Sequence, residues 1–211
     1  GATGSGKSTI LNLIVRNYDI QEGQILIDGL DIKQIKRASL RKHIGQMMQD
    51  VFLFSGTIAE NIALHDENVT KEEIIKASQY VGADTFIQKL DHTYDHLVLE
   101  RGNNFSSGQR QLISFARALV YQPSLMILDE ATANIDSETE ALIQESLEKM
   151  MSISTMIIVA HRLSTIQHSD QIIVMQKGEI KESGNHQDLL KQKGLYYHLY
   201  TLQEEEKKEG A

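Results

Sequence analysis

The hydrophobic positions of the chain fall into helical and strand-like runs. The spacing of apolar residues predicts a helix over Lys7 to Arg16 with one buried face. Three short apolar runs, rich in β-branched or bulky residues, are typical of strands buried on both faces, as in a parallel sheet under helices: Leu125–Leu128, Met156–Ala160 and Ile172–Met175. A further strand, Gln24 to Ile27, is expected to end in a tight turn at Asp28-Gly29.

The middle of the chain follows a different pattern. Between Thr70 and Tyr121 there is no comparable strand, and the spacing predicts helices over Lys71–Val81, Ala83–Leu90 and Ser107–Val120. We therefore expect an α/β fold, with a mainly parallel sheet core over residues 1–50 and 122–185 and an inserted helical subdomain over 51–121. Helices are expected over 186–203 and a charged, solvated tail over 204–211.

The first nine residues, GATGSGKST, fit the phosphate-loop pattern G-x-x-x-x-G-K-[ST]. Its glycines let the main chain approach phosphates closely. The lysine charge is expected to face the β and γ phosphates, and the serine hydroxyl is expected to be a ligand of Mg²⁺. The predicted nucleotide-binding residues are Gly1, Thr3, Gly4, Ser5, Gly6, Lys7, Ser8 and Thr9. This predicts a P-loop NTPase with a RecA-like core. Because such a loop normally follows a buried strand, we expect the chain to lack its first strands and its adenine-stacking residue.

Composition narrows the function classes. The 211 residues carry a formal net charge of −8, which argues against binding the nucleic-acid backbone. The absence of cysteine excludes a disulfide scaffold and a thiolate metal site. No apolar run approaches the roughly 18 to 20 residues that span a bilayer. These 211 residues are therefore expected to be soluble, although the whole protein need not be.

Polar residues with catalytic potential follow the predicted strands. Asp129 is placed to hold Mg²⁺, and the adjacent Glu130, whose side chain points the other way, can act as general base toward an attacking water. His161 follows Met156–Ala160 and can contact the γ-phosphate or organise the water. Gln49, at a predicted strand-to-helix junction, can reach Mg²⁺ or the water.

The string FSSGQRQ, residues 105–111, starts the helical pattern that runs to Val120. Its serine hydroxyl and main-chain N–H groups predict an anion site at a helix start. Since the chain already has a phosphate loop, the expected target is the γ-phosphate bound to a partner subunit, so that two chains enclose two ATP molecules. The alternative interpretation is an ordinary serine N-cap.

The ordered motifs resemble the nucleotide-binding domain of ABC transporters. GATGSGKST, Gln49, FSSGQRQ, LMILDE, the segment Ala133-Asn134-Ile135-Asp136 and His161 correspond to that family's six motifs, up to about Leu202. The strings VFLFSGTIAENI and Glu100-Arg101-Gly102 resemble exporters with fused membrane helices. The resemblance implies ATP and Mg²⁺ as cofactors, Glu130, His161 and Gln49 as catalytic residues, and Ser8, Gln49 and Asp129 at the metal. It also implies that Ser106, Ser107, Gly108, Gln109 and Asp136 contact the partner's nucleotide.

Two residues depart from the family's LSGGQ signature: Phe105 replaces the leucine and Ser107 replaces the first glycine. If the backbone at Ser107 is left-handed, a serine there costs roughly 1 to 2 kcal/mol, which would weaken closure about tenfold or more. This asymmetry resembles one half of a heterodimeric bacterial multidrug exporter. A third departure, Leu99 before Glu-Arg-Gly, affects only the expected coupling surface.

The resemblance implies export of a substrate, with multidrug or lipid-type cargo expected, at the cytoplasmic face of a cell membrane. The expected partners are a second nucleotide-binding domain, in a homodimer or the favoured heterodimer, and a transmembrane domain outside these residues, but no nucleic acid. Three alternatives remain: a soluble ABC ATPase acting on nucleic acid or ribosomes, a non-hydrolysing nucleotide sensor, and the separate ATPase subunit of an importer.

Overall fold

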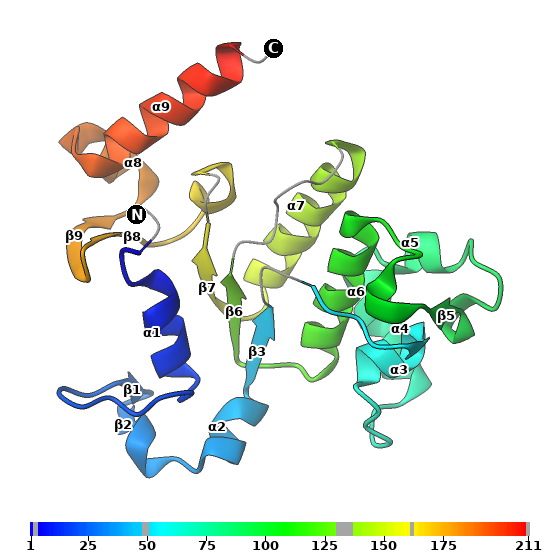
Figure 1. Ribbon diagram of the computed structural model, residues 1–211. Coiled ribbons are helices and arrows are strands. Elements are labelled where there is room, and N and C mark those ends of the chain that lie inside the picture. Colours follow the sequence, from blue (N-terminus) through cyan, green and yellow to red (C-terminus); the bar gives the residue numbers. More distant parts are fainter. Residues whose placement is uncertain (2–3, 48–50, 130–136, 161–162, 210–211) are drawn as a thin grey trace. The chain divides into compact units, whose positions relative to one another are not determined.

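A computed structural model describes residues 1, 4–47, 51–129, 137–160 and 163–209 (Figure 1). The chain forms two compact units, one made of Gly1–Gln34 with Ile158–Ala211 and the other of Ile35–Ile157. The predicted boundaries of core and helical subdomain differ from the limits of these units and stay a prediction. Each unit is described separately below.

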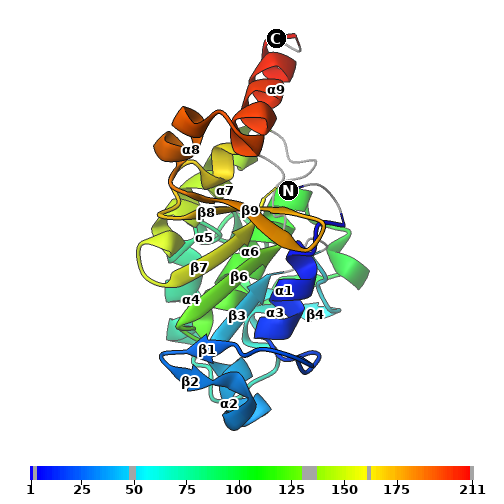
Figure 2. The same ribbon diagram turned by 90° about the vertical axis from the view of Figure 1, so that its left-hand side faces the viewer.

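The second unit contains most of a three-stranded sheet in the order β3-β6-β7 (Figures 1 and 2). Its strands are β3 (Ile44–Met47), β6 (Leu125–Asp129) and β7 (Thr155–Val159). β3 runs parallel to β6, with Ile44 opposite Leu125 and Met47 opposite Leu128. Residues 126–128 are at most 1% exposed, so the apolar run predicted to be a buried strand forms the centre of this sheet.

Helices make up most of the rest of the second unit. They are α2 (Arg37–Lys42), α3 (Ile58–Ala63), α4 (Lys71–Tyr80), α5 (Asp84–Ile87), α6 (Ser107–Val120) and α7 (Ser137–Met151). The three helices expected in the middle block are confirmed, although α5 is shorter than predicted. Short pieces connect them: β4 (Gly56–Thr57), η2 (Thr93–Asp95), β5 (Leu97–Val98) and η3 (Glu100–Gly102).

Capping boxes fix where α3 and α4 begin. Thr57 accepts a hydrogen bond from the backbone N–H of Glu60, and the Glu60 carboxylate accepts one from the N–H of Thr57. Thr70 and Glu73 repeat this arrangement at α4. In both pairs, backbone hydrogen bonds hold the pKa of the glutamate below its usual value. These reciprocal bonds satisfy N–H groups that have no partner within a helix.

A buried amide and a guanidinium join three segments of the second unit. Asn61 on α3 is 2% exposed, and its side chain bonds both the N–H and the carbonyl of Phe54, each at 2.8 Å. Arg117 on α6 donates to the carbonyl oxygens of Asn61 at 2.8 Å and Phe52 at 2.9 Å, and to the Asn61 amide oxygen at 3.1 Å. Desolvation lowers the pKa of Arg117. α3, α6 and the segment after residue 50 are thereby held together.

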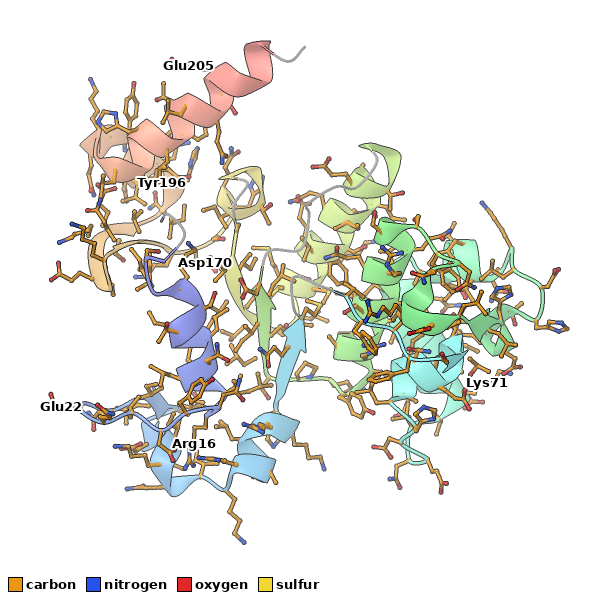
Figure 3. All side chains as sticks on the ribbon, viewed as in Figure 1. Arg16, Glu22, Lys71, Asp170, Tyr196 and Glu205 are labelled. Atoms are coloured by element: carbon orange, nitrogen blue, oxygen red, sulfur yellow. The ribbon has the colours of Figure 1, made fainter. Side chains whose placement is uncertain are left out.

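The first unit begins with α1 (Lys7–Ile14), which is shorter than the predicted helix. Arg16, labelled in Figure 3, donates to the Ile32 carbonyl at 2.8 Å and so joins the end of α1 to η1 (Ile32–Gln34). The hairpin of β1 (Leu26–Ile27) and β2 (Leu30–Asp31) turns at Asp28 and Gly29, with φ values of 50° and 80°. Positive φ at both positions is typical of a type I′ turn, so the tight turn is confirmed.

The apolar run Ile172–Met175 does not behave as predicted. It forms β8 (Ile172–Gln176), which pairs antiparallel with β9 (Glu179–Gly184) in a two-stranded sheet of the described residues. Ile173 is 50% exposed, so the strand is not buried on both faces. The interpretation failed because β9, with the sequence EIKESG, lacks the apolar run of a partner strand. The Lys177-Gly178 turn, φ 51° and 80°, closes the hairpin.

Two helices follow the hairpin, as expected: α8 (His186–Gln192) and α9 (Leu195–Glu209). The η4 segment (Leu163–Ile166) precedes the hairpin. The Glu182 carboxylate on β9 accepts hydrogen bonds from the backbone N–H groups of Leu195 and Tyr196 at the start of α9. Tyr196 packs with Ile172, Val174 and Leu189 in a buried cluster. The predicted tail from Glu204 is helical as far as Glu209.

Replacing Asn61 with alanine tests the buried network. Asn61→Ala should lower the free energy of unfolding by about 3 kcal/mol, because it leaves the N–H and carbonyl of Phe54 without their partner and removes one of the three hydrogen bonds of Arg117. Urea denaturation measures the change. Asn68→Ala is the control, since Asn68 is exposed and bonds the Asp66 carboxylate, and it should change stability by only about 0.5 kcal/mol. Equal losses in the two variants would contradict the role of the network.

Candidate functional site: the nucleotide-binding motifs

The phosphate loop has the backbone that its glycines predict. Gly4 and Gly6 have φ values of 78° and 102°, in the left-handed region that favours glycine. Ser5 between them is 4% exposed. The Lys7 ammonium donates to the Gly1 carbonyl oxygen at 2.6 Å and lies 3.5 Å from the Ser5 hydroxyl. The lysine charge therefore lies over the turn itself. Thr3 lies outside the described residues.

The N-terminus of α1 differs from those of α3, α4 and α6. Its N-cap, Gly6, provides no side-chain hydrogen bond, and its first turn contains no acidic residue. The other three helices begin with a Thr or Ser that caps the backbone and a Glu or Gln that completes a capping box. A helix N-terminus carries partial positive charge that attracts anions. Together with the Lys7 ammonium, it gives a donor set that fits a phosphate group.

The predicted catalytic residues follow three neighbouring strands of one sheet. In the sequence Gln49 comes two residues after β3, Glu130 directly after β6, and His161 two residues after β7. The sheet order is β3-β6-β7, and parallel pairing puts the ends of β3 and β6 at the same edge. Asp129 is half-buried at the end of β6. Gln49, Glu130, Asp136 and His161 lie outside the described residues, so their roles stay predictions.

The signature string FSSGQRQ begins α6 as a complete capping box. The Ser106 hydroxyl accepts from the N–H of Gln109 at 3.2 Å, and the Gln109 amide oxygen accepts from the N–H of Ser106 at 3.0 Å. The alternative interpretation, a serine N-cap, is therefore correct for the local structure. Ser106, Ser107, Gly108 and Gln109 together form the first turn of α6, and their contact with a partner's nucleotide stays a prediction.

Ser107 is not strained. Ser107 is the first residue of α6 and its φ is not positive, whereas strain would arise only in a left-handed backbone. The condition for strain is therefore not met: the helix begins at Ser107, and the preceding Ser106 has the extended conformation of an N-cap, φ −64° and ψ 161°. A serine at the first helical position costs little. An effect of Ser107 on nucleotide binding must therefore come from its additional side-chain atoms.

Phe105 is accommodated as a buried anchor of the signature helix. It is 5% exposed, and its ring lies edge-on to those of Phe86 and His96, with centroids 6.2 and 5.9 Å away. Arg110 donates to the Phe105 carbonyl at 2.7 Å. A Cβ atom on Gly102, φ 69°, would lie 3.0 Å from the Arg110 side chain. The Glu100-Arg101-Gly102 string therefore packs against the start of α6.

Four apolar side chains of the second unit are exposed. Phe52 and Phe54 are each about half exposed and contact edge-to-face, with centroids 4.9 Å apart. Leu97 and Leu99 are 63% and 57% exposed. Arg117, in the last turn of α6, bonds the Phe52 carbonyl, so the aromatic pair is connected directly to α6. Sequence reasoning missed Asn61 and Arg117, because only the structure shows that their polar side chains are shielded from solvent.

The described residues lack two features. No helix there is long and apolar enough to cross a membrane. No group of three or more His, Cys, Asp or Glu side chains there is arranged to hold a metal ion. Mg²⁺ bound by a serine hydroxyl, a single carboxylate and phosphate oxygens would not form such a group. The donor types of Ser8 and Asp129, a hydroxyl and a carboxylate, suit this hard cation.

The first turn of α6 gives a matched pair of stability tests. Ser106→Ala should lower the free energy of unfolding by about 1 kcal/mol, because it removes the N-cap oxygen. Ser107→Gly should lower it by about 0.5 kcal/mol, since glycine is a poorer helix residue. Both are measured by urea denaturation. A gain of 1 kcal/mol or more in Ser107→Gly would instead reveal the strain that the backbone geometry excludes.

Known proteins give a consistent result. The chain is 53% identical over 207 residues to the probable multidrug resistance ABC transporter ATP-binding/permease protein YheH of Bacillus subtilis, covering 98% of this chain and 31% of that protein. It is 53% identical over 203 residues to the uncharacterized ABC transporter ATP-binding protein YknV of the same species, covering 96% and 34%. The chain therefore spans about a third of the length of these relatives.

A solved structure of a bacterial Atm1-family ABC exporter with ATP bound matches with a TM-score of 0.89 and 42% identity, covering 96% of this chain and 36% of that one. A family model described as ABC transporter matches residues 1–133, more than half of the chain. The α/β fold is thus that of a P-loop NTPase. The chain belongs to the ABC transporter family and carries its ATP-binding domain.

Proposed function

We propose that this domain binds ATP with Mg²⁺ and hydrolyses it to power export of a substrate across a membrane. The observation that carries the proposal is the N-terminus of α1, which has left-handed glycines and Lys7 in place of a side-chain cap. The relatives support export, since one is named a multidrug resistance transporter and a structural neighbour is an exporter. Multidrug or lipid-type cargo belongs to this proposal.

The nucleotide contacts are assigned by donor chemistry. Lys7 would move from the Gly1 carbonyl to the β and γ phosphates, since a phosphate is a stronger partner for an ammonium than a neutral carbonyl. The loop from Gly1 to Thr9 supplies main-chain N–H groups. The Ser8 hydroxyl, Asp129 and Gln49 would hold Mg²⁺, which neutralises phosphate charge.

Hydrolysis is assigned to the residues after the strands. We assign Glu130 as the base that takes a proton from the attacking water, and His161 as the residue that contacts the γ-phosphate or orders that water. Both follow adjacent strands of the β3-β6-β7 sheet, the kind of strand-end position where α/β folds place ligands. A positioned base contributes on the order of 10²- to 10⁴-fold in rate.

Two such domains would act together. Ser106 to Gln109 and Asp136 would contact ATP held by the phosphate loop of a second nucleotide-binding domain. The capping box supports this, because it satisfies the N–H groups of Ser106 and Gln109 and fixes the first turn of α6 in advance. We favour a heterodimer: Ser107 adds side-chain atoms at the turn where the family has glycine, so this half-site would be the weaker one.

The remaining length of the relatives supports a membrane partner. The YheH relative is named an ATP-binding/permease protein, which supports a transmembrane domain in the same protein. In this proposal the ATP-binding domain lies at the cytoplasmic face of a cell membrane. The surface of Phe52, Phe54, Leu97 and Leu99 is the proposed contact for the transmembrane domain. These side chains are exposed and apolar, and Phe52 is bonded to the signature helix. ATP-dependent closure would reach the membrane domain through this surface.

Two variants of the full-length protein test the reaction. Glu130→Gln should keep ATP binding and lower kcat by about 10²- to 10⁴-fold, because the amide cannot accept the water's proton. It should also trap the dimer of nucleotide-binding domains in the closed state. Lys7→Ala should weaken ATP binding about tenfold or more. Phosphate release and equilibrium binding measure both. Turnover near wild type in Glu130→Gln would refute the role of Glu130.

Ser107→Gly tests the unequal pair. If this signature is the weaker half-site, removing the side-chain atoms of Ser107 should raise ATPase turnover at the partner's phosphate loop by about twofold or more while leaving this chain's own site unchanged. Turnover at each site is isolated by disabling the other site's base. Identical kinetics before and after the substitution would contradict the heterodimer proposal.

A further inference from the structure

The β8–β9 hairpin contacts the phosphate loop within the first unit (Figures 1 and 2). The backbone N–H of Gly178, in the hairpin turn, donates to the Ser5 carbonyl oxygen at 3.0 Å. A Cβ atom on Gly6 would lie 3.4 Å from the Met175 Cε atom and 3.5 Å from the Gly178 Cα atom. A Cβ atom on Gly1 would overlap the Met175 carbonyl oxygen. Both ends of the loop therefore lie against this hairpin.

Met175 faces the loop because of the regular alternation of side chains along β8. Ile172 and Val174 lie on one face of the strand, in the cluster with Tyr196. Ile173 and Met175 lie on the other face, where Ile173 is 50% exposed but Met175 only 8%. The difference arises at the phosphate loop, since the Met175 side chain lies against Gly6. The β-bulge of the hairpin is on the opposite strand, where Lys181 is the extra residue between the partners of Val174 and Met175.

We propose that Met175 and the Lys177-Gly178 turn are positioning elements for nucleotide binding, which hold the phosphate loop in its binding conformation without touching the nucleotide. This inference rests on the proposed function, since it assumes that the loop binds ATP. Its physical reason is preorganisation: a loop held in place loses less freedom when phosphate binds. The contacts with the hairpin also give a second reason for glycine at positions 1 and 6, besides the close approach of the phosphates to the main chain.

Two glycines provide a matched test. Gly178 and Gly29 both occupy the second position of a type I′ hairpin turn with φ 80°, and a Cβ atom at either meets nothing within 4 Å. Alanine therefore imposes the same backbone strain at both, but only Gly178 bonds the phosphate loop. In the full-length protein, Gly178→Ala should raise the Kd for Mg²⁺ and a non-hydrolysable ATP analogue about fivefold or more, and Gly29→Ala by less than about twofold.

A second pair separates positioning from general loss of packing. Met175→Ala should raise the same Kd about fivefold or more, and Met175→Leu, of similar volume, should restore it to within about twofold of wild type. Val174→Ala, one residue away and equally buried, should lower Tm as much as Met175→Ala but leave the Kd within about twofold. Melting curves confirm that each variant is folded.

The outcomes are distinct. Weaker binding in Gly178→Ala and Met175→Ala alone supports the proposal. Equal effects in the control variants, or unchanged binding in all four alanine variants, would overturn it. Lys7→Ala, measured alongside, tests the proposed function itself: if it also binds normally, the loop is not the phosphate site. If only Lys7→Ala is weakened, the loop binds ATP without help from the hairpin.

Discussion

A network around one buried amide and one half-buried guanidinium holds the helical part of the second unit together. Asn61 and Arg117 bring together α3, α6 and the segment at Phe52 and Phe54, and every bond they make is to a backbone group or to each other. Because burial makes an unsatisfied polar group costly, the three segments cannot separate independently. The last turn of the signature helix, the capped helix α3 and the exposed aromatic pair are therefore held together by this one network.

The N-terminus of α1 contrasts with those of α3, α4 and α6. At α3, α4 and α6 the sequence supplies its own hydroxyl and its own carboxylate or amide, so that the first turn is complete without a ligand. At α1 it supplies glycine and lysine instead, which favour an external anion. The contrast fits the two roles in the proposed cycle. The start of α1 would bind the triphosphate, and the capped start of α6 would contact the triphosphate bound by the partner.

Sequence reasoning worked where a signal was local. The phosphate loop, the central strand β6, the turn at Asp28-Gly29 and the helix from Ser107 each depend on a few neighbouring residues, and each was placed within a few positions. It failed where the outcome depended on distant partners. The run Ile172–Met175 has the composition of a central strand, yet its pairing with polar β9 makes it half of a hairpin. Likewise the backbone of Ser107 follows from Ser106 acting as N-cap, which a comparison of glycine with serine alone does not reveal.

The acidic side chain of Glu182 gives the β8–β9 hairpin a second attachment. At its turn the hairpin bonds the carbonyl of Ser5, and on β9 the Glu182 carboxylate accepts the first N–H groups of α9. A Cβ atom at Gly194 would collide with that carboxylate, so a larger residue there would have to displace the Glu182 side chain. The start of the carboxy-terminal helix and the phosphate loop are thus joined through only four strand residues, 179–182, and the turn at Gly178.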